Sequence, residues 1–205
     1  MSVIATPPTP ISATTPPPVG GPRPWRCTRE QYEKFVAAGF FRDSRYQLIR
    51  GEIIDMGKEG PRHFSTVALA VQVLTTAFGP GYFVRNAGPL ALDDSQPEPD
   101  VAVVAGSPRD HLASHPVTAL LAVEVAETSL AYDTRTKAEL YATAGVADYW
   151  VVDVENRQLH VYRDPQPRPA LETTTYATHL TFGAADTVSP LAAPTATVRV
   201  ADLLP

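Results

Sequence analysis

Hydrophobic and polar positions alternate with two different periods along this chain, which indicates a mixture of helices and strands. Helical spacing predicts helices over 28–39, 61–79 and 133–145. Short runs rich in β-branched and aromatic residues predict strands over 45–50, 51–56, 82–87, 89–94, 100–105, 119–125, 148–154, 158–164 and 172–182. This order predicts a mixed β-sheet flanked by helices, an α/β or α+β architecture.

Local signals indicate where several elements begin and end. Thr28 is the expected N-cap of the first helix, Gln31 completes a capping box, and Gly39 ends the helix. A tight turn at Arg50-Gly51 joins the first two strands. Six residues of the second helix are expected to face the core: Phe64, Val67, Ala68, Val71, Leu74 and Phe78.

The two ends of the chain differ in composition from its middle. Residues 1–24 are rich in Pro, Thr, Ser and Gly and are predicted to form a disordered arm, with a ligand for a proline-recognising domain as the alternative. Residues 25–205 are predicted to form one domain. The stretch 165–170 and the Pro-containing C-terminal stretch are interpreted as loops around a late edge element.

Composition narrows the class of protein. With 44% hydrophobic and 19% charged residues, the 205-residue chain is typical of a soluble globular protein. We expect a cytoplasmic protein without a membrane span, because no apolar run approaches about 18 residues and no signal-peptide pattern is visible. Cys27 is the only cysteine, which excludes an internal disulfide. The net charge of −5 means that any binding of nucleic acid must depend on a local site.

Two carboxylates stand where apolar strands are predicted. Asp100 precedes the run "VAVVA", and Glu124 lies inside "LLAVEVA". A buried carboxylate is costly without a partner, so Asp100 either is a solvated strand end or faces a metal ion or another cation. Glu124 either forms a salt bridge, lies at a strand end, or converges with Asp100. If the two converge from neighbouring strands, their hard oxygen atoms suit Mg²⁺ or Mn²⁺.

A lysine follows on the next predicted helix. Lys137, Tyr141 and Ala144 recur at helical spacing, which places Lys137 on or beside the face that packs on the sheet. One interpretation is that its ammonium group reaches solvent or pairs with Asp133. The other is that it is a catalytic cation near Asp100 and Glu124.

Residues 28–163 resemble the Uma-type family of putative restriction endonucleases, within the PD-(D/E)XK nuclease superfamily. The resemblance is carried by "YQLIRGEII", "PRHFSTV", "PEPDVAVV", "LLAVEVAETS", "DTRTKAELYATAGVADYWVVD" and "LHVYR". It implies a restriction-endonuclease-like fold. It also implies that Asp100, Glu124 and the backbone carbonyl of Val125 bind a divalent metal ion.

The chain departs from the family pattern at two positions. Ala126 stands where the superfamily carries its lysine, two residues after the acidic strand residue, and Lys137 is the expected substitute. Gln47 stands where the family often carries a glutamate, whereas Glu52 is retained and His63 matches a histidine of the family. Four residues are candidates to support the metal ligands or to contact the substrate: Gln47, Glu52, His63 and Tyr141. The hydroxyl of Tyr141 is expected to reach a polar partner beneath the site.

The predicted function is that of a metal-dependent endonuclease acting on phosphodiester bonds, with DNA as its expected partner. Asp100, Glu124 and Lys137 are the predicted catalytic residues. Two alternatives stay open: a nuclease-like fold without activity that serves as a binding or regulatory module, and a hydrolase of another phosphoester. Many nucleases of this superfamily form dimers, so a homodimer is a further expectation. Basic residues in the first half are expected to line a groove: Arg42, Arg45, Arg50, Lys58, Arg62 and Arg85.

Overall fold

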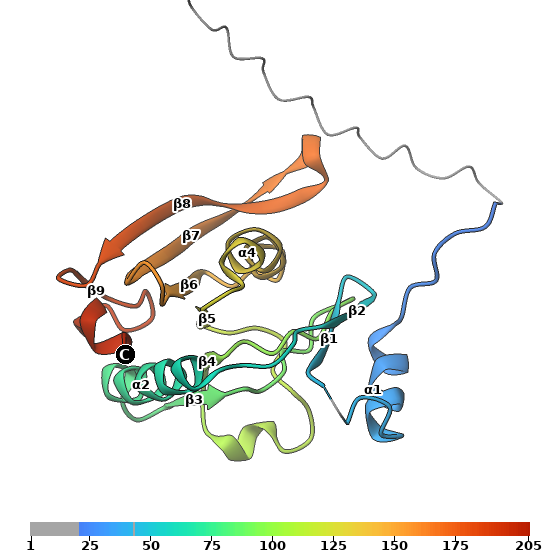
Figure 1. Ribbon diagram of the computed structural model, residues 1–205, viewed down its shortest axis with the longest axis horizontal. Helices are drawn as coiled ribbons and strands as arrows, with labels where there is room; N and C mark the ends of the chain where they lie inside the picture. The colour runs from blue at the N-terminus through green and yellow to red at the C-terminus, as the bar shows by residue number, and fades with distance from the viewer. Residues whose placement is uncertain (1–20, 43) are drawn as a thin grey trace, which may run out of the picture.

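A six-stranded mixed sheet organises the computed structural model, which describes residues 21–42 and 44–205 (Figure 1). The strand order is β3 (Tyr82–Asn86), β4 (Val101–Ala105), β5 (Leu121–Ala126), β6 (Asp148–Asp153), β7 (Gln158–Arg168) and β8 (Thr173–Gly183). Strands β5 and β6 are parallel, and the other neighbouring pairs are antiparallel. The predicted mixed sheet is therefore confirmed. Most of the predicted arm falls on residues 1–20, which lie outside the described residues.

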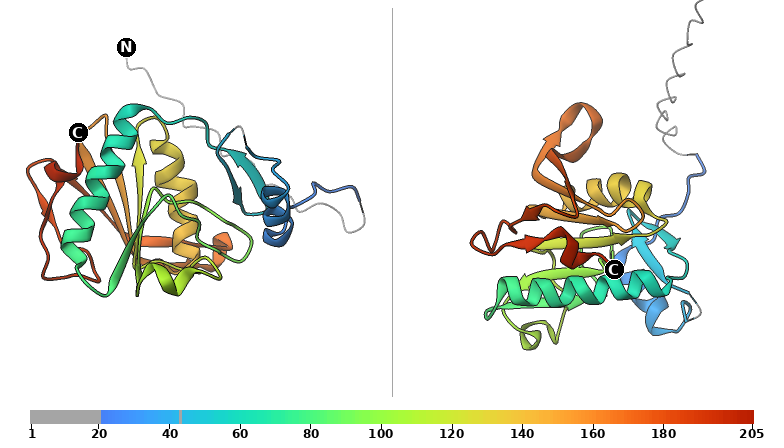
Figure 2. Two further views of the ribbon diagram at one scale, coloured as in Figure 1. Left: turned by 90° about the horizontal axis from the view of Figure 1, so that it is seen from below. Right: turned by 60° about the vertical axis from the view of Figure 1, so that its left-hand side comes forward.

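Helices cover both faces of this sheet (Figures 1 and 2). Helix α2 (Pro61–Phe78) lies on one face. The other face is covered by a continuous helical segment made of α3 (Leu130–Tyr132), the π-helical turn η2 (Asp133–Lys137) and α4 (Ala138–Thr143). Because parallel strands cannot be joined by a tight turn, this segment is the crossover that connects β5 to β6.

The central strands are buried on both faces, which explains their nearly continuous apolar sequences. On the α2 side, Val123 and Val125 of β5 join one hydrophobic cluster, and on the α4 side Ala122 and Ala126 join another. Since side chains alternate along a strand, Glu124 shares the face of Ala122 and Ala126 and points toward the crossover helices.

The N-terminal elements match the sequence signals closely. Helix α1 (Arg29–Ala37) has Thr28 as its N-cap with the complete capping box to Gln31. Strands β1 (Tyr46–Ile49) and β2 (Glu52–Asp55) form the predicted hairpin. Arg50 and Gly51 both have positive φ, 51° and 77°, as a two-residue turn of type I′ requires.

The C-terminal stretch returns to the α2 side of the sheet. Strands β9 (Thr187–Val188) and β10 (Val198–Arg199) pair with each other, and the 3₁₀ turn η4 (Val200–Leu203) follows. Val198, Val200 and Leu203 are buried in the α2-side cluster. Two further 3₁₀ turns are η1 (Pro108–His111) and η3 (Pro169–Leu171). Within the described residues, no helix has the length and apolarity needed to cross a membrane.

Three sequence predictions about the elements are wrong. In α2, Phe64 is 62% exposed and Ala68 is also exposed, whereas His63, Thr66 and Ala70 are buried. The predicted core positions Val67, Leu74 and Phe78 are buried as expected, whereas in the first turn His63 points inward and forms a buried hydrogen bond with Asp100.

The other two errors concern loops. The stretch 89–94 is not a strand, because the amides of Leu90 and Ala91 donate to the carbonyls of Pro97 and Pro116 and fold it into a loop. The predicted loop at 165–170 instead begins with the last part of β7. Pairing between β6 and β7 ends at Arg163, so beyond it β7 is an edge strand, where Pro165 and Pro167 are tolerated.

Candidate metal centre

Most of the candidate site residues line one cavity of about 240 Å³, between the start of α2 and the crossover segment. Of the predicted residues, this cavity includes Asp100, Glu124, Val125, Lys137, Gln47 and His63. Its other lining residues are Arg45, Met56, Lys58, Glu59, Gly60, Glu127, Thr128, Ser129 and Asp133. Residues from five separate stretches of sequence therefore converge at one place.

Asp100 is fixed immediately before β4 by the neighbouring strand. Its Oδ2 accepts a hydrogen bond of 2.7 Å from the backbone N–H of Val125. Its Oδ1 lies 3.2 Å from Nε2 of His63. Asp100 is buried, so these contacts replace the water that the carboxylate would otherwise bind.

Glu124 extends from β5 toward the crossover segment, where two donors meet it. Its Oε1 accepts hydrogen bonds from Nζ of Lys137 at 2.7 Å and from the hydroxyl of Tyr141 at 2.6 Å. Burial raises the pKa of Glu124 to about 7; the charge of Lys137 opposes this shift, while Asp100 adds to it. Burial alone would lower the pKa of Lys137, but Glu124 and Asp133 raise it, so the lysine is charged.

The π-helical turn η2 places two charged side chains inside the protein. A π-turn widens the helix locally and is frequent at functional sites. Here Asp133 and Lys137, at the two ends of η2, are both buried. The hydroxyl of Ser129 donates to the carboxylate of Asp133. The regular helical spacing in the sequence correctly predicted that Lys137 lies on the face of the helix that packs on the sheet. It did not indicate the π-turn or the burial of Asp133.

Two other candidates have different surroundings. Gln47 is 1% exposed and donates from Nε2 to the carbonyl of Glu98 at 3.3 Å, whereas its buried Oε1 has no partner among the described residues. Glu52 is exposed on β2, pairs with Arg26 at 3.2 Å, and is not among the residues that line the cavity.

Of the six basic residues expected along a groove, Arg45 and Lys58 line this cavity.

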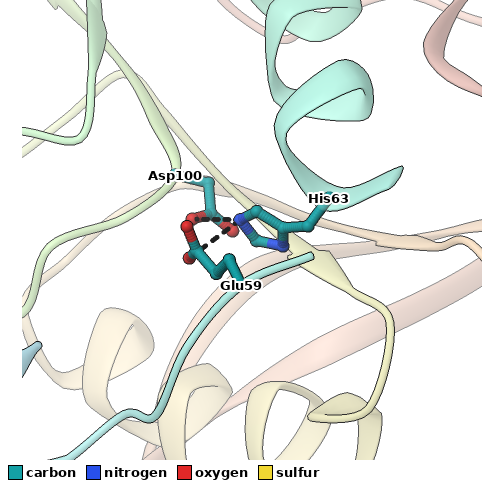
Figure 3. A group of neighbouring side chains, drawn as sticks. All are labelled: Glu59, His63 and Asp100. Atoms are coloured by element: carbon teal, nitrogen blue, oxygen red, sulfur yellow. Dashed lines mark hydrogen bonds and ion pairs between the residues drawn. The ribbon is translucent and has the colours of Figure 1, made fainter. Parts of the chain in front are cut away.

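Glu59 is a site residue that the sequence analysis missed. Its Oε1 lies 2.9 Å from Nε2 of His63 (Figure 3). The same oxygen also contacts the guanidinium of Arg45. Burial lowers the pKa of His63, but the hydrogen bond to Asp100 and the charge of Asp100 together raise it by more, so the pKa is raised overall. The spacing of four residues between Glu59 and His63 was the available sequence signal, although Glu59 precedes the helix and has no apolar neighbours that mark it as buried.

The charges of the lining residues fit a bound cation. Five carboxylates, those of Glu59, Asp100, Glu124, Glu127 and Asp133, face three permanently basic groups. Burial, to which the charges of Asp100 and Asp133 add, raises the pKa of Glu124. A divalent ion would neutralise it, and carboxylate and carbonyl oxygens are ligands that Mg²⁺ and Mn²⁺ accept. The residues present therefore fit a divalent metal ion.

Comparisons with known proteins give a family and a fold. The model of the Uma2 family, described as "Putative restriction endonuclease", matches residues 29–199. A solved structure, described as a putative nuclease belonging to DUF820 from Anabaena variabilis ATCC 29413, aligns with a TM-score of 0.63. The two chains are 17% identical, and the alignment covers 78% of this chain and 90% of that one. No curated protein matches this chain. At this identity, the structural likeness shows a shared fold.

Proposed function

Because this chain belongs to the Uma2 family of putative restriction endonucleases, we propose that it is a metal-dependent endonuclease that hydrolyses phosphodiester bonds in DNA. One observation carries the proposal: Asp100 and Glu124, buried at neighbouring antiparallel strands, line the same cavity as the buried Lys137. Buried carboxylates beside a buried cation are expensive to maintain for stability alone. Their convergence in a cavity supports a chemical role.

The proposed metal ligands are Asp100, Glu124 and the backbone carbonyl of Val125. A Mg²⁺ or Mn²⁺ ion held there would lower the pKa of a bound water and neutralise charge on the phosphoryl oxygens. The N–H of Val125 holds Oδ2 of Asp100, which fixes the orientation of that carboxylate without using its other oxygen. Tyr141 in turn orients the carboxylate of Glu124.

Lys137 is the proposed catalytic cation. It comes from the crossover segment rather than from β5, where Ala126 occupies the position expected for a lysine. Its ammonium group is held 2.7 Å from Oε1 of Glu124 and remains charged. From there it can orient the attacking water or stabilise the negative charge that develops on the phosphoryl oxygens.

The second candidate function is that of a nuclease-like fold without activity, acting as a binding module. Gln47 favours it, because a neutral amide stands in the cavity where a carboxylate would add a metal ligand. The net charge of −5 also opposes strong binding to a polyanion. The two candidate functions differ in metal binding and in cleavage.

Calorimetric titration of Mg²⁺ and Mn²⁺, together with incubation of supercoiled plasmid, tests the proposal. We expect the wild type to bind both ions and to cleave, and Asp100→Asn/Glu124→Gln to lose both properties while keeping its circular dichroism spectrum. The control Glu30→Gln/Glu139→Gln removes the same charge from two exposed ion pairs outside the cavity and should behave as the wild type. Cleavage by the Asp100/Glu124 variant at the wild-type rate would refute the proposal, and metal binding without cleavage of any DNA would favour the binding module.

A further inference from the structure

A second set of metal-binding atoms lies beside the proposed site, on the side of α2. One carboxylate oxygen of Glu59, one ring nitrogen of His63 and one carboxylate oxygen of Asp100 all lie within 4.8 Å of one another (Figure 3). Nε2 of His63 is 2.9 Å from the glutamate oxygen and 3.2 Å from the aspartate oxygen. Two ligand atoms at right angles around an octahedral ion, each at about 2.1 Å, are separated by about 3 Å. The imidazole nitrogen is therefore spaced from each of the two carboxylate oxygens as neighbouring ligands of an octahedral ion are spaced.

The orphaned amide oxygen of Gln47 is an independent indication of a ligand. Gln47 lines the same cavity as Glu59, His63 and Asp100, and its side chain is almost completely buried. Its Oε1 has no hydrogen-bond partner in the described part of the protein. An unsatisfied buried acceptor costs about 1–3 kcal/mol. A cation in the cavity, or a water molecule bound to one, would satisfy this oxygen.

We propose that Glu59, His63 and Asp100 hold a second divalent cation, next to the ion assigned to Asp100, Glu124 and Val125. This inference rests on the proposed function, since Asp100 contributes to both sites. An imidazole nitrogen among the ligands favours a transition-metal ion such as Mn²⁺ over Mg²⁺. The second site is thus expected to prefer Mn²⁺ over Mg²⁺, whereas the all-oxygen site accepts both ions.

Arg45 is the group that the cation must displace. Its guanidinium contacts Oε1 of Glu59, and its side chain is about one-third exposed. An exposed arginine can turn to solvent at little cost, because its charge remains hydrated. In the absence of the metal ion, the guanidinium of Arg45 therefore neutralises the carboxylate of Glu59.

Mn²⁺ binding to the full-length protein tests the second site with a readout independent of cleavage. Calorimetry gives the number of bound ions, and paramagnetic broadening of the histidine ring signals in NMR spectra shows which imidazole is close to Mn²⁺. We expect two Mn²⁺ ions per wild-type chain, and the loss of one ion, or at least tenfold weaker binding of it, in Glu59→Gln and His63→Asn. Glu139→Gln and His115→Asn are the matched controls and should bind two ions, since Glu139 pairs with an arginine as Glu59 does but lies outside the cavity.

The variant Glu124→Gln separates this inference from the proposed function. It should lose Mg²⁺ binding and cleavage, yet Mn²⁺ should still broaden the ring signals of His63. Unchanged Mn²⁺ stoichiometry in Glu59→Gln and His63→Asn, or no broadening at His63, would overturn the second site and leave the nuclease proposal intact. Conversely, Mn²⁺ binding at His63 in a protein that never cleaves DNA would support the second site and refute the nuclease proposal.

Discussion

Lys137 shows how a single residue connects stability with chemistry. Its side chain is 1% exposed, and burying an ammonium group without compensation costs several kcal/mol. Compensation comes from the hydrogen bond to Glu124 and from the nearby charges of Asp133 and Asp100. The lysine and the carboxylates therefore depend on one another, and removal of one member leaves the others buried and unbalanced.

We predict that Lys137→Met lowers plasmid cleavage by about 100-fold or more, because the charge that stabilises the transition state is lost. The same change should lower the free energy of unfolding by about 3–5 kcal/mol in urea titrations, since Glu124 loses its buried partner. The double variant Lys137→Met/Glu124→Gln should be less destabilised than the single one. Lys34→Met, on the exposed face of α1, is the control. Cleavage by Lys137→Met at the wild-type rate would exclude a catalytic role for the lysine.

Some site residues were identifiable from sequence because their surroundings are unusual. Asp100 and Glu124 stand out as carboxylates at or within apolar strands, and Lys137 lies at helical spacing from residues that pack on the sheet. Glu59 and Asp133 gave no such signal. The first precedes a helix in a polar loop, and the second is buried through the π-turn, whose geometry depends on tertiary contacts. Their roles became visible from distances alone.

At the scale of elements, Asp148 connects two strands with the C-terminal stretch. It is fully buried at the start of β6 and accepts hydrogen bonds from the indole of Trp150, the guanidinium of Arg163 in β7 and the amide of Leu191. The carboxylate thus holds the returning chain beside β6 and β7, where the C-terminal residues complete the core around α2.

We predict that Arg163→Ala lowers the free energy of unfolding by about 3–5 kcal/mol, because Asp148 is left as a buried charge without its cationic partner. Chemical denaturation measures this loss. Arg157→Ala, on an exposed residue between the same strands, should change stability by less than about 0.5 kcal/mol. Equal stability of the wild type and Arg163→Ala would show that the Asp148 contacts do not hold the C-terminal stretch in place.

The elements themselves were predictable to different degrees. The strands of the main sheet, the β1–β2 hairpin and the capping box of α1 follow from local sequence, because periodicity and turn residues agree with the tertiary structure. The core-facing positions Val67, Leu74 and Phe78 of α2 followed from the apolar pattern, but the first turn did not, since His63 rather than Phe64 points inward, to Asp100. The strand expected at 89–94 fails because its amides have partners in distant loops.

For the molecule as a whole, the net charge of −5 disfavours binding to DNA, which is a polyanion. Three of the six basic residues expected along a groove form ion pairs: Arg45 with Glu59, Arg50 with Glu139, and Arg62 with Glu155. Lys58 is exposed and lines the cavity. Binding of DNA would therefore use a few phosphate contacts around the site, with modest affinity and a small dependence on salt.

We predict that Lys58→Ala weakens DNA binding for every sequence tested and reduces the slope of log affinity against log salt by about 0.9, as the loss of one phosphate contact requires. Fluorescence anisotropy at several salt concentrations measures both quantities. Lys34→Ala removes a lysine of α1 that is paired with Glu30, and it should leave the slope unchanged. An identical slope for Lys58→Ala and the wild type would place the DNA elsewhere.

Anomalous diffraction from crystals soaked in Mn²⁺ is a decisive test of the proposed metal centre, because it locates the ion without relying on activity. We predict an anomalous peak within about 2.0–2.3 Å of carboxylate oxygens of Asp100 and Glu124 and of the carbonyl oxygen of Val125. A cavity without any peak, in crystals of a protein that cleaves plasmid in the same Mn²⁺ concentration, would contradict the proposed metal centre.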